Sequence, residues 1–168
     1  MNYHNITHDD MNNGDGLRVV LWVSGCSHHC YLCQNPQTWD PHSGILFDEK
    51  AKQEIFTELS HDYISGITLS GGDPLYSYNL AEVSNLLQEI TIKFPNKTIW
   101  LYTGYTWEEC MSDYNKKDII KHCDVIVDGE YVDSQRDITL KWKGSSNQRV
   151  IDVRKSLNTG QVVLYDQG

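Results

Sequence analysis

The feature that most constrains the fold of this chain is the alternation of short apolar runs with amphipathic stretches. Four runs are rich in β-branched or aromatic residues and are apolar at consecutive positions: residues 17–23, 66–69, 98–102 and 124–127. Consecutive apolar residues over so short a length are typical of strands that are covered on both faces. Strands that alternate with helices in this way indicate βαβ units and a mostly parallel sheet.

The segments between these runs carry helix signals. Asp48 is expected to cap a helix that places three apolar residues on one face: Ala51, Ile55 and Leu59. Two further segments, 79–82 and 106–109, have the Asn/Thr-x-x-Glu spacing of a capping box and predict two more helices.

The length of the chain limits the architecture. With 168 residues it can form one continuous core, and we expect a single domain over residues 1–168. A complete eight-fold βα barrel needs about 250 residues. The predicted fold is therefore α/β, an incomplete (partial) βα barrel or an open sheet, mostly parallel. Residues 149–153 and 161–165 are expected as late strands, antiparallel at an edge.

Each predicted strand is followed at once by a turn of small and polar residues: Ser24-Gly-Cys26, Ser70-Gly-Gly-Asp73, Thr103-Gly-Tyr105 and Asp128-Gly-Glu130. In parallel α/β folds, ligands bind where the carboxyl ends of the strands converge. Four such turns predict one shared site. Paired glycines let the backbone approach a ligand, so Gly71 and Gly72 could bind the charged groups of an amino acid. Thr103 and Tyr105 could contact an adenine or a ribose.

Three of the five cysteines fall within eight residues, in Cys26-Ser-His-His-Cys30-Tyr-Leu-Cys33. Three thiolates can hold three irons of a [4Fe–4S] cubane and leave one iron open, whereas a fully protein-ligated cluster generally uses four cysteines. Two alternatives stay open, a zinc ion that also binds His28 or His29, and redox-sensing thiols. We expect both histidines to be solvated loop residues rather than metal ligands. Cys110 and Cys123 are expected as packing residues.

Composition excludes some classes of partner. Lys and Arg total 14 against 23 for Asp and Glu, a net charge of −9. Nucleic acid is not expected as a partner, because phosphate binding relies on basic clusters. The longest apolar runs fall far short of the about 20 residues that a membrane-spanning helix needs. Residues 1–10 carry no basic region and no apolar stretch, so we expect no secretory signal and a cytoplasmic location.

Taken in order, these motifs resemble the radical S-adenosylmethionine superfamily. Within it, they are similar to the family that activates the anaerobic (class III) ribonucleoside-triphosphate reductase. The matching segments run through nearly the whole chain: residues 13–18, 23–33, 35–39, 69–75, 100–105, 124–129 and 144–148.

The resemblance implies that Cys26, Cys30 and Cys33 bind one [4Fe–4S] cluster, whose open iron takes the methionine end of S-adenosylmethionine. Contacts with that cofactor are implied for several residues: Leu32, Cys33 and Gln34 along it, Gly71, Gly72 and Asp73 at its methionine end, and Thr103 and Tyr105 elsewhere. Reductive cleavage would give methionine and a 5′-deoxyadenosyl radical. That radical would take a hydrogen atom from a glycine near the C-terminus of the reductase, with a flavodoxin or ferredoxin as electron donor.

The chain departs from the family pattern at four positions. Asp15 stands where proline is usual and Gln34 where an aromatic residue is usual, while Leu32 replaces an aromatic residue and Lys143 an arginine. None of these changes removes an expected cluster ligand. Two other functions stay open: an activase of another glycyl radical enzyme such as pyruvate formate-lyase, whose activases tend to be longer, and a non-enzymatic zinc or iron–sulfur module.

Overall fold

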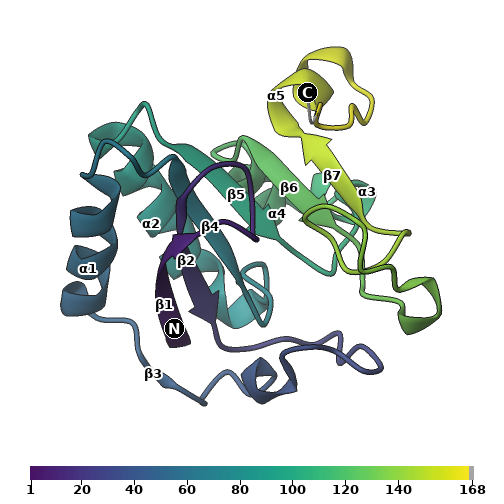
Figure 1. Ribbon diagram of the computed structural model, residues 1–168, viewed down its shortest axis with the longest axis horizontal. Helices are drawn as coiled ribbons and strands as arrows, with labels where there is room; N and C mark the ends of the chain where they lie inside the picture. Colours follow the sequence, from purple (N-terminus) through teal and green to yellow (C-terminus); the bar gives the residue numbers. More distant parts are fainter. Residues whose placement is uncertain (167–168) are drawn as a thin grey trace.

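The computed structural model describes residues 1–166, in which a seven-stranded sheet is accompanied by five α-helices (Figure 1). The strands are β1 (Asn2–Asp10), β2 (Arg18–Val23), β3 (Ile45–Leu46), β4 (Gly66–Gly71), β5 (Thr98–Tyr102), β6 (Val125–Asp128) and β7 (Arg149–Asp152). The helices are α1 (Glu49–Leu59), α2 (Leu80–Lys93), α3 (Trp107–Met111), α4 (Tyr114–Ile120) and α5 (Val153–Thr159). In this described part of the chain, no helix has the length and apolarity to cross a bilayer.

The sheet has the strand order β3-β1-β2-β4-β5-β6-β7. Its centre, β2-β4-β5-β6, is parallel, whereas β1, β3 and β7 pair antiparallel with their neighbours. The α/β class, the parallel centre and the antiparallel edge strand at β7 are thus confirmed. The pairings form an open series with β3 and β7 at its edges, and the incomplete barrel stays a prediction.

Local signals explain most helix starts. The side chain of Asp48 accepts a hydrogen bond from Ala51 N at 2.9 Å, and Thr106 with Glu109 forms the predicted capping box. Asn79 directly precedes α2 as expected, but its side chain makes no capping hydrogen bond. The chain enters α2 through a 3-10 turn, and the Asn79 amide instead donates to the backbone oxygens of Ser24 and Asp73.

Three strand assignments differ from the sequence prediction, which includes neither β1 nor the two-residue β3. Most side chains of β1 are polar, and its burial is limited to a few positions such as Tyr3 and Ile6, so periodicity does not indicate this strand. The predicted strand at 161–165 is wrong. That segment makes one isolated bridge, Ile151 to Leu164, because only a short stretch of it meets β7.

The two faces of the sheet are covered differently. Side chains alternate along a strand, so Val19, Leu21 and Val23 of β2 point to the face that packs against the helices. The opposite face holds a smaller cluster that joins Trp100 of β5 to Trp142, which belongs to the loop between β6 and β7. Because no helix covers this second face in the described structure, loops and a cavity occupy it.

Arg18, which is fully buried at the start of β2, fastens the amino ends of the parallel strands. Its guanidinium donates five hydrogen bonds of 2.8–2.9 Å, to Asp15 O, Ile67 O, Thr68 Oγ1, Thr98 O and Thr98 Oγ1. A Cβ at Gly66 would lie 2.8 Å from Nη2, and one at Gly14 only 2.7 Å from Cδ. These glycines therefore make room for the arginine. Burial lowers the pKa of Arg18 to about 10.

We predict that Arg18→Met lowers the free energy of unfolding by about 3 kcal/mol, because buried acceptors lose their donors. The matched control is Arg154→Met, which removes a side chain that is 77% exposed and pairs with Asp124. It should cost less than about 1 kcal/mol. Urea denaturation of both variants measures the difference. Equal losses would contradict a special role for Arg18.

Candidate functional site

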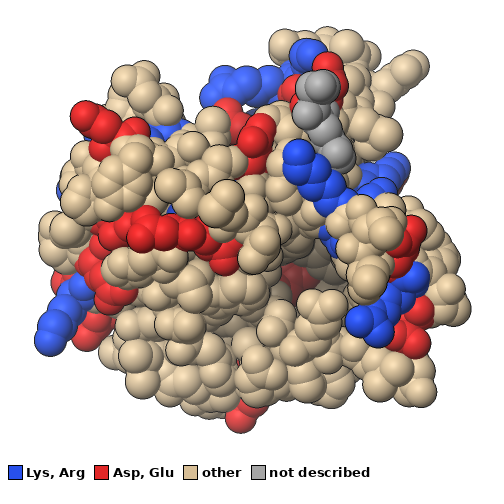
Figure 2. All heavy atoms as spheres, in the orientation of Figure 1, with Lys and Arg blue, Asp and Glu red and all other residues tan. Residues whose placement is uncertain are grey.

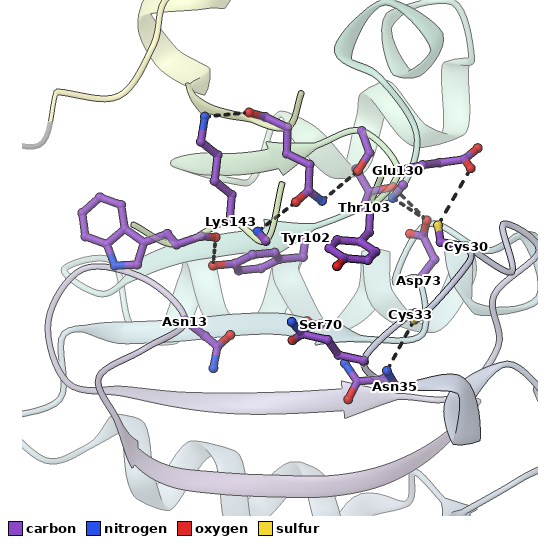
Figure 3. Close-up of a pocket in the computed structure, with 18 of the residues that line it drawn as sticks. Asn13, Cys30, Cys33, Asn35, Ser70, Asp73, Tyr102, Thr103, Glu130 and Lys143 are labelled. Carbon is purple, nitrogen blue, oxygen red and sulfur yellow. Dashed lines mark hydrogen bonds between the residues drawn. The ribbon is translucent and has the colours of Figure 1, made fainter. Parts of the chain in front are cut away.

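A cavity of about 810 Å³ lies at the carboxyl ends of the central strands, on the face that the helices leave open (Figure 3). Its volume falls within the range of small-molecule sites, about 300–1,000 Å³. The surface is hollowed in the middle of the molecule, next to Lys and Arg side chains (Figure 2). One side of the cavity is formed by the cysteine loop and the other by the loop between β6 and β7.

Most of the predicted site residues line this cavity: Cys26, Cys30, Cys33, Gln34, Gly71, Gly72, Asp73 and Thr103. Leu32 and Tyr105 do not. Leu32 is 58% exposed. The Tyr105 ring lies between the ring of His28 and the ammonium of Lys116, each 4.5 Å from its centroid. The structure therefore gives no support to a cofactor contact by either Leu32 or Tyr105.

The three loop cysteines are free thiols and half-buried. Cys33 Sγ accepts from Asn35 N at 3.4 Å, and Cys30 Sγ lies 3.8 Å from Glu130 Oε2. Burial raises the pKa of Cys26 to about 11, although the N–H groups of His28 and His29 partly oppose this. Soft thiol donors that share one loop and face a cavity fit an iron–sulfur cluster.

Asp73, which is 1% exposed, joins three turns through its carboxylate. Oδ2 accepts from Thr103 Oγ1 at 3.0 Å and from Gly104 N at 2.9 Å, and it lies 2.8 Å from His28 Nε2. Oδ1 accepts from Leu75 N at 2.8 Å. The same carboxylate therefore holds the cysteine loop, the turn after β4 and the turn after β5.

The expectation that His28 is a solvated loop residue is wrong, because its side chain is only 8% exposed. Its second nitrogen, Nδ1, lies 3.2 Å from Glu130 Oε1. Burial by itself lowers the pKa of His28, but Asp73 and then Glu130 outweigh it, and the pKa is raised. Since both ring nitrogens face carboxylates, His28 offers no free lone pair to a zinc ion. His29 is exposed and stacks on Trp39.

Glycine is required at positions 71 and 72 because the backbone of the neighbouring segment approaches both positions closely. A Cβ at Gly71, whose φ is +111°, would lie 2.6 Å from the backbone of Val23, and one at Gly72 would lie 2.5 Å from Gly25 O. The N–H of Gly72 donates to Val23 O and that of Asp73 to Gly25 O. These two N–H groups are therefore engaged within the protein.

The turn after β6 is held by a second buried carboxylate. Asp128 is 1% exposed and accepts from Trp107 N at the start of α3 and from the Arg149 guanidinium. Arg149 also donates to both carboxylate oxygens of Glu108. Lys143 stands where the family resemblance implies an arginine. Its ammonium donates to Gln148 O at 2.9 Å, a hydrogen bond within the loop between β6 and β7.

Ser70 and Glu130, which belong to two of the predicted turns, line the cavity together with three polar residues that the sequence did not single out: Asn13, Asn35 and Tyr102 (Figure 3). Tyr102 stands at the carboxyl end of β5, a position that could have indicated it. Asn13 comes from the β1–β2 loop, and nothing in the local sequence brings it to this site. Trp39 also lines the cavity, and its buried Nε1 has no partner among the described residues.

Comparison with known proteins gives consistent matches. A family model described as "4Fe-4S single cluster domain" matches residues 12–151. The anaerobic ribonucleoside-triphosphate reductase-activating protein of Enterobacteria phage T4 is 45% identical over 152 residues, covering 89% of this chain and 93% of that protein. The proteins of the same name from Vibrio cholerae and Escherichia coli K12 are 41% and 40% identical, over 88% and 92% of this chain and 96% and 100% of theirs.

We predict that Thr103→Val destabilises the protein by about 1–3 kcal/mol, because buried Asp73 loses a hydroxyl donor. The control is Thr91→Val, whose exposed hydroxyl donates to Leu87 O within α2. It should change the free energy of unfolding by less than about 0.5 kcal/mol. Denaturation by urea measures both values, and a Thr103→Val protein as stable as the control would refute the role given to this hydrogen bond.

We also predict an acid-dependent contribution from Glu108. The hydrogen bond from Arg149, opposed by burial, lowers the pKa of Glu108. Its stabilisation is therefore full above the unfolded value, about 4.3, and is lost as the pH falls through the lower folded value.

Glu108→Gln should accordingly destabilise at pH 7 by less than about 1 kcal/mol, since the side chain is 61% exposed, and the difference from the parent should be smaller at about pH 3. Glu49→Gln, at a position that is 89% exposed, is the control. Thermal unfolding at both pH values tests this, and a difference that grows toward low pH would contradict it.

Proposed function

This chain belongs to the family of anaerobic ribonucleoside-triphosphate reductase-activating proteins, with a 4Fe-4S domain, and from that premise we propose that it is a radical S-adenosylmethionine enzyme. It cleaves S-adenosylmethionine reductively and generates a glycyl radical on the anaerobic ribonucleoside-triphosphate reductase. The observation that carries this proposal is the set of three free thiols, Cys26, Cys30 and Cys33, on the wall of a cavity large enough for a cofactor.

In this proposal, Cys26, Cys30 and Cys33 hold one [4Fe–4S] cluster per chain. The bound cluster supplies one electron and an open iron position, so that the S–C5′ bond of S-adenosylmethionine breaks to methionine and a 5′-deoxyadenosyl radical. The radical takes a hydrogen atom from the Cα of a glycine on the reductase, which leaves 5′-deoxyadenosine and the glycyl radical. A flavodoxin or ferredoxin provides the electron.

The residues of the chain bind and orient the cofactor. Gln34, Gly71, Gly72, Asp73 and Thr103 line the cavity next to the cysteines, and we assign them to contacts with S-adenosylmethionine. The hydroxyl of Thr103 donates to Asp73 and accepts from Tyr105 N, so its contact uses the methyl group or the backbone. The side chain of Asp73 is likewise engaged, and it orients the turn instead of binding the ligand directly.

The open face of the sheet supports the choice of a macromolecular substrate. The helices pack on the other face, and the β1–β2 loop and the loop after β6 both line the cavity on the open face. We regard residues 1–168 as one domain and the sheet as an incomplete barrel, open on the side where a segment of the reductase enters. The relatives match this chain over 93–100% of their length, which favours the reductase over the partners of longer activases.

The proposal predicts that the anaerobically reconstituted protein binds about four irons. After reduction it should consume S-adenosylmethionine, release 5′-deoxyadenosine and produce a glycyl signal in electron paramagnetic resonance when the reductase is added. Stoichiometric zinc without iron would refute the cluster. Cleavage without a glycyl signal on the reductase, but with one on pyruvate formate-lyase, would assign the chain to the other partner.

Single substitutions sharpen this test. Cys26→Ala, Cys30→Ala and Cys33→Ala should each lose most of the iron and all cleavage of S-adenosylmethionine. Cys110→Ala is the matched control, because Cys110 belongs to α3, is fully buried in the core and does not line the cavity. It should keep iron and activity at some cost in stability. Iron content that is insensitive to all three loop substitutions would contradict the ligand assignment.

A further inference from the structure

Apart from the N–H groups of His28 and His29, which bond to the Cys26 sulfur, the backbone of the cysteine loop makes few hydrogen bonds. Among the described residues, the segment 27–32 takes part in one backbone–backbone hydrogen bond, from Cys33 N to Cys30 O. His29 and Leu32, which lie on either side of Cys30, have φ values of +48° and +57°. Left-handed backbone is unfavourable for residues other than glycine, so contacts from outside the loop must hold this conformation.

The side chain of His28 supplies such contacts. It reaches out of the loop to Asp73 Oδ2 at 2.8 Å and to Glu130 Oε1 at 3.2 Å. Asp73 follows β4 and Glu130 follows β6, and the ring also packs edge-on against Tyr105, which follows β5. One side chain from the cysteine loop therefore touches the turns after all three of the neighbouring parallel strands.

The turn after β5 has the shape that admits this ring. A Cβ at Gly104 would lie 2.5 Å from His28 Cδ2 and 2.7 Å from Nε2. Contacts this close do not occur for real Cβ atoms, so any other residue at 104 would displace the imidazole. The backbone N–H of Gly104 meanwhile donates to Asp73 at 2.9 Å. Glycine at this position therefore allows both the imidazole and the backbone N–H to reach one carboxylate oxygen.

We propose that His28 is a positioning residue, which bridges Asp73 and Glu130 and thereby fixes the sulfurs of Cys26 and Cys30 against the turns of the cavity. The bridge belongs to the protein itself and needs no bound group. Its importance for the cluster rests on the function proposed above. His29 has no such role, because its ring stacks on Trp39 at 4.4 Å within the same connection between β2 and β3.

The first test uses the cluster-free full chain and is independent of any activity. Hydrogen exchange of residues 25–34 is compared in the parent, His28→Asn and His29→Asn. Asparagine tolerates the left-handed backbone at 29, so that variant is a matched control. We expect exchange to be at least about tenfold faster in His28→Asn, since hydrogen bonds to charged groups are lost. Equal rates in the parent and His28→Asn would overturn the proposal.

A second variant separates bridging from packing. His28→Phe keeps a ring against Tyr105 but cannot bond to either carboxylate. It should exchange as fast as His28→Asn, whereas exchange as slow as in the parent would show that packing alone holds the loop and would overturn the bridge. Glu130→Gln keeps a polar group at the exposed end and should accelerate exchange less than either variant. A larger acceleration than in His28→Phe would contradict the assignment of the buried end to Asp73.

The reconstituted protein provides a third readout. We expect His28→Phe to lose iron to a chelator several-fold faster than the parent, to broaden the electron paramagnetic resonance spectrum of the reduced cluster, and to lower the melting temperature, because buried Asp73 loses a hydrogen-bond partner. His29→Asn should match the parent in all three. If the parent itself binds no iron, the proposed function fails while the exchange test still decides the bridge. If the parent binds iron and His28→Phe retains it equally well, the inference fails alone.

Discussion

The buried carboxylate of Asp73 is the interaction on which the geometry of the site depends. Placing a charged group at 1% exposure is costly unless it is fully hydrogen-bonded, and Asp73 meets that requirement with partners from three separate segments. Each partner lies at or beyond the carboxyl end of a strand, or in the loop that follows one. Satisfying one carboxylate thus forces the turns after β4 and β5 and the cysteine loop into a single arrangement.

Arg18 holds the amino ends of the parallel strands together in the same way. Its guanidinium bonds to backbone and hydroxyl oxygens of β4 and β5, and glycines at 14 and 66 give it space. Two buried charged groups of opposite sign therefore lie at opposite ends of the central strands. The apolar core on the helix face fixes the sheet, while these polar groups fix its ends, and the remaining face is left free for a cavity.

The glycines of the turns suggest ligand binding in the sequence, but in the structure they are needed for close packing of the protein backbone. Gly71 and Gly72 suggest a backbone open to a ligand, yet the space that a side chain would need is taken by the end of β2 at Gly71 and by the backbone of Gly25 at Gly72. Gly104 likewise makes room for the ring of His28. In each case the small residue permits two protein segments to meet, and the cavity is a consequence of that close packing.

The sequence by itself determined the α/β class, the four parallel strands, the caps at Asp48 and Thr106 and the clustering of three cysteines, because each follows from periodicity or spacing over a few residues. The tertiary structure alone decided how His28 is buried, why the Asn79 side chain bonds to other loops instead of capping α2, and which polar residues line the cavity. Those outcomes depend on partners 45 to 102 residues away, such as His28 with Asp73 and Glu130. Local preference cannot encode a hydrogen bond whose acceptor is brought into reach only when the sheet has formed.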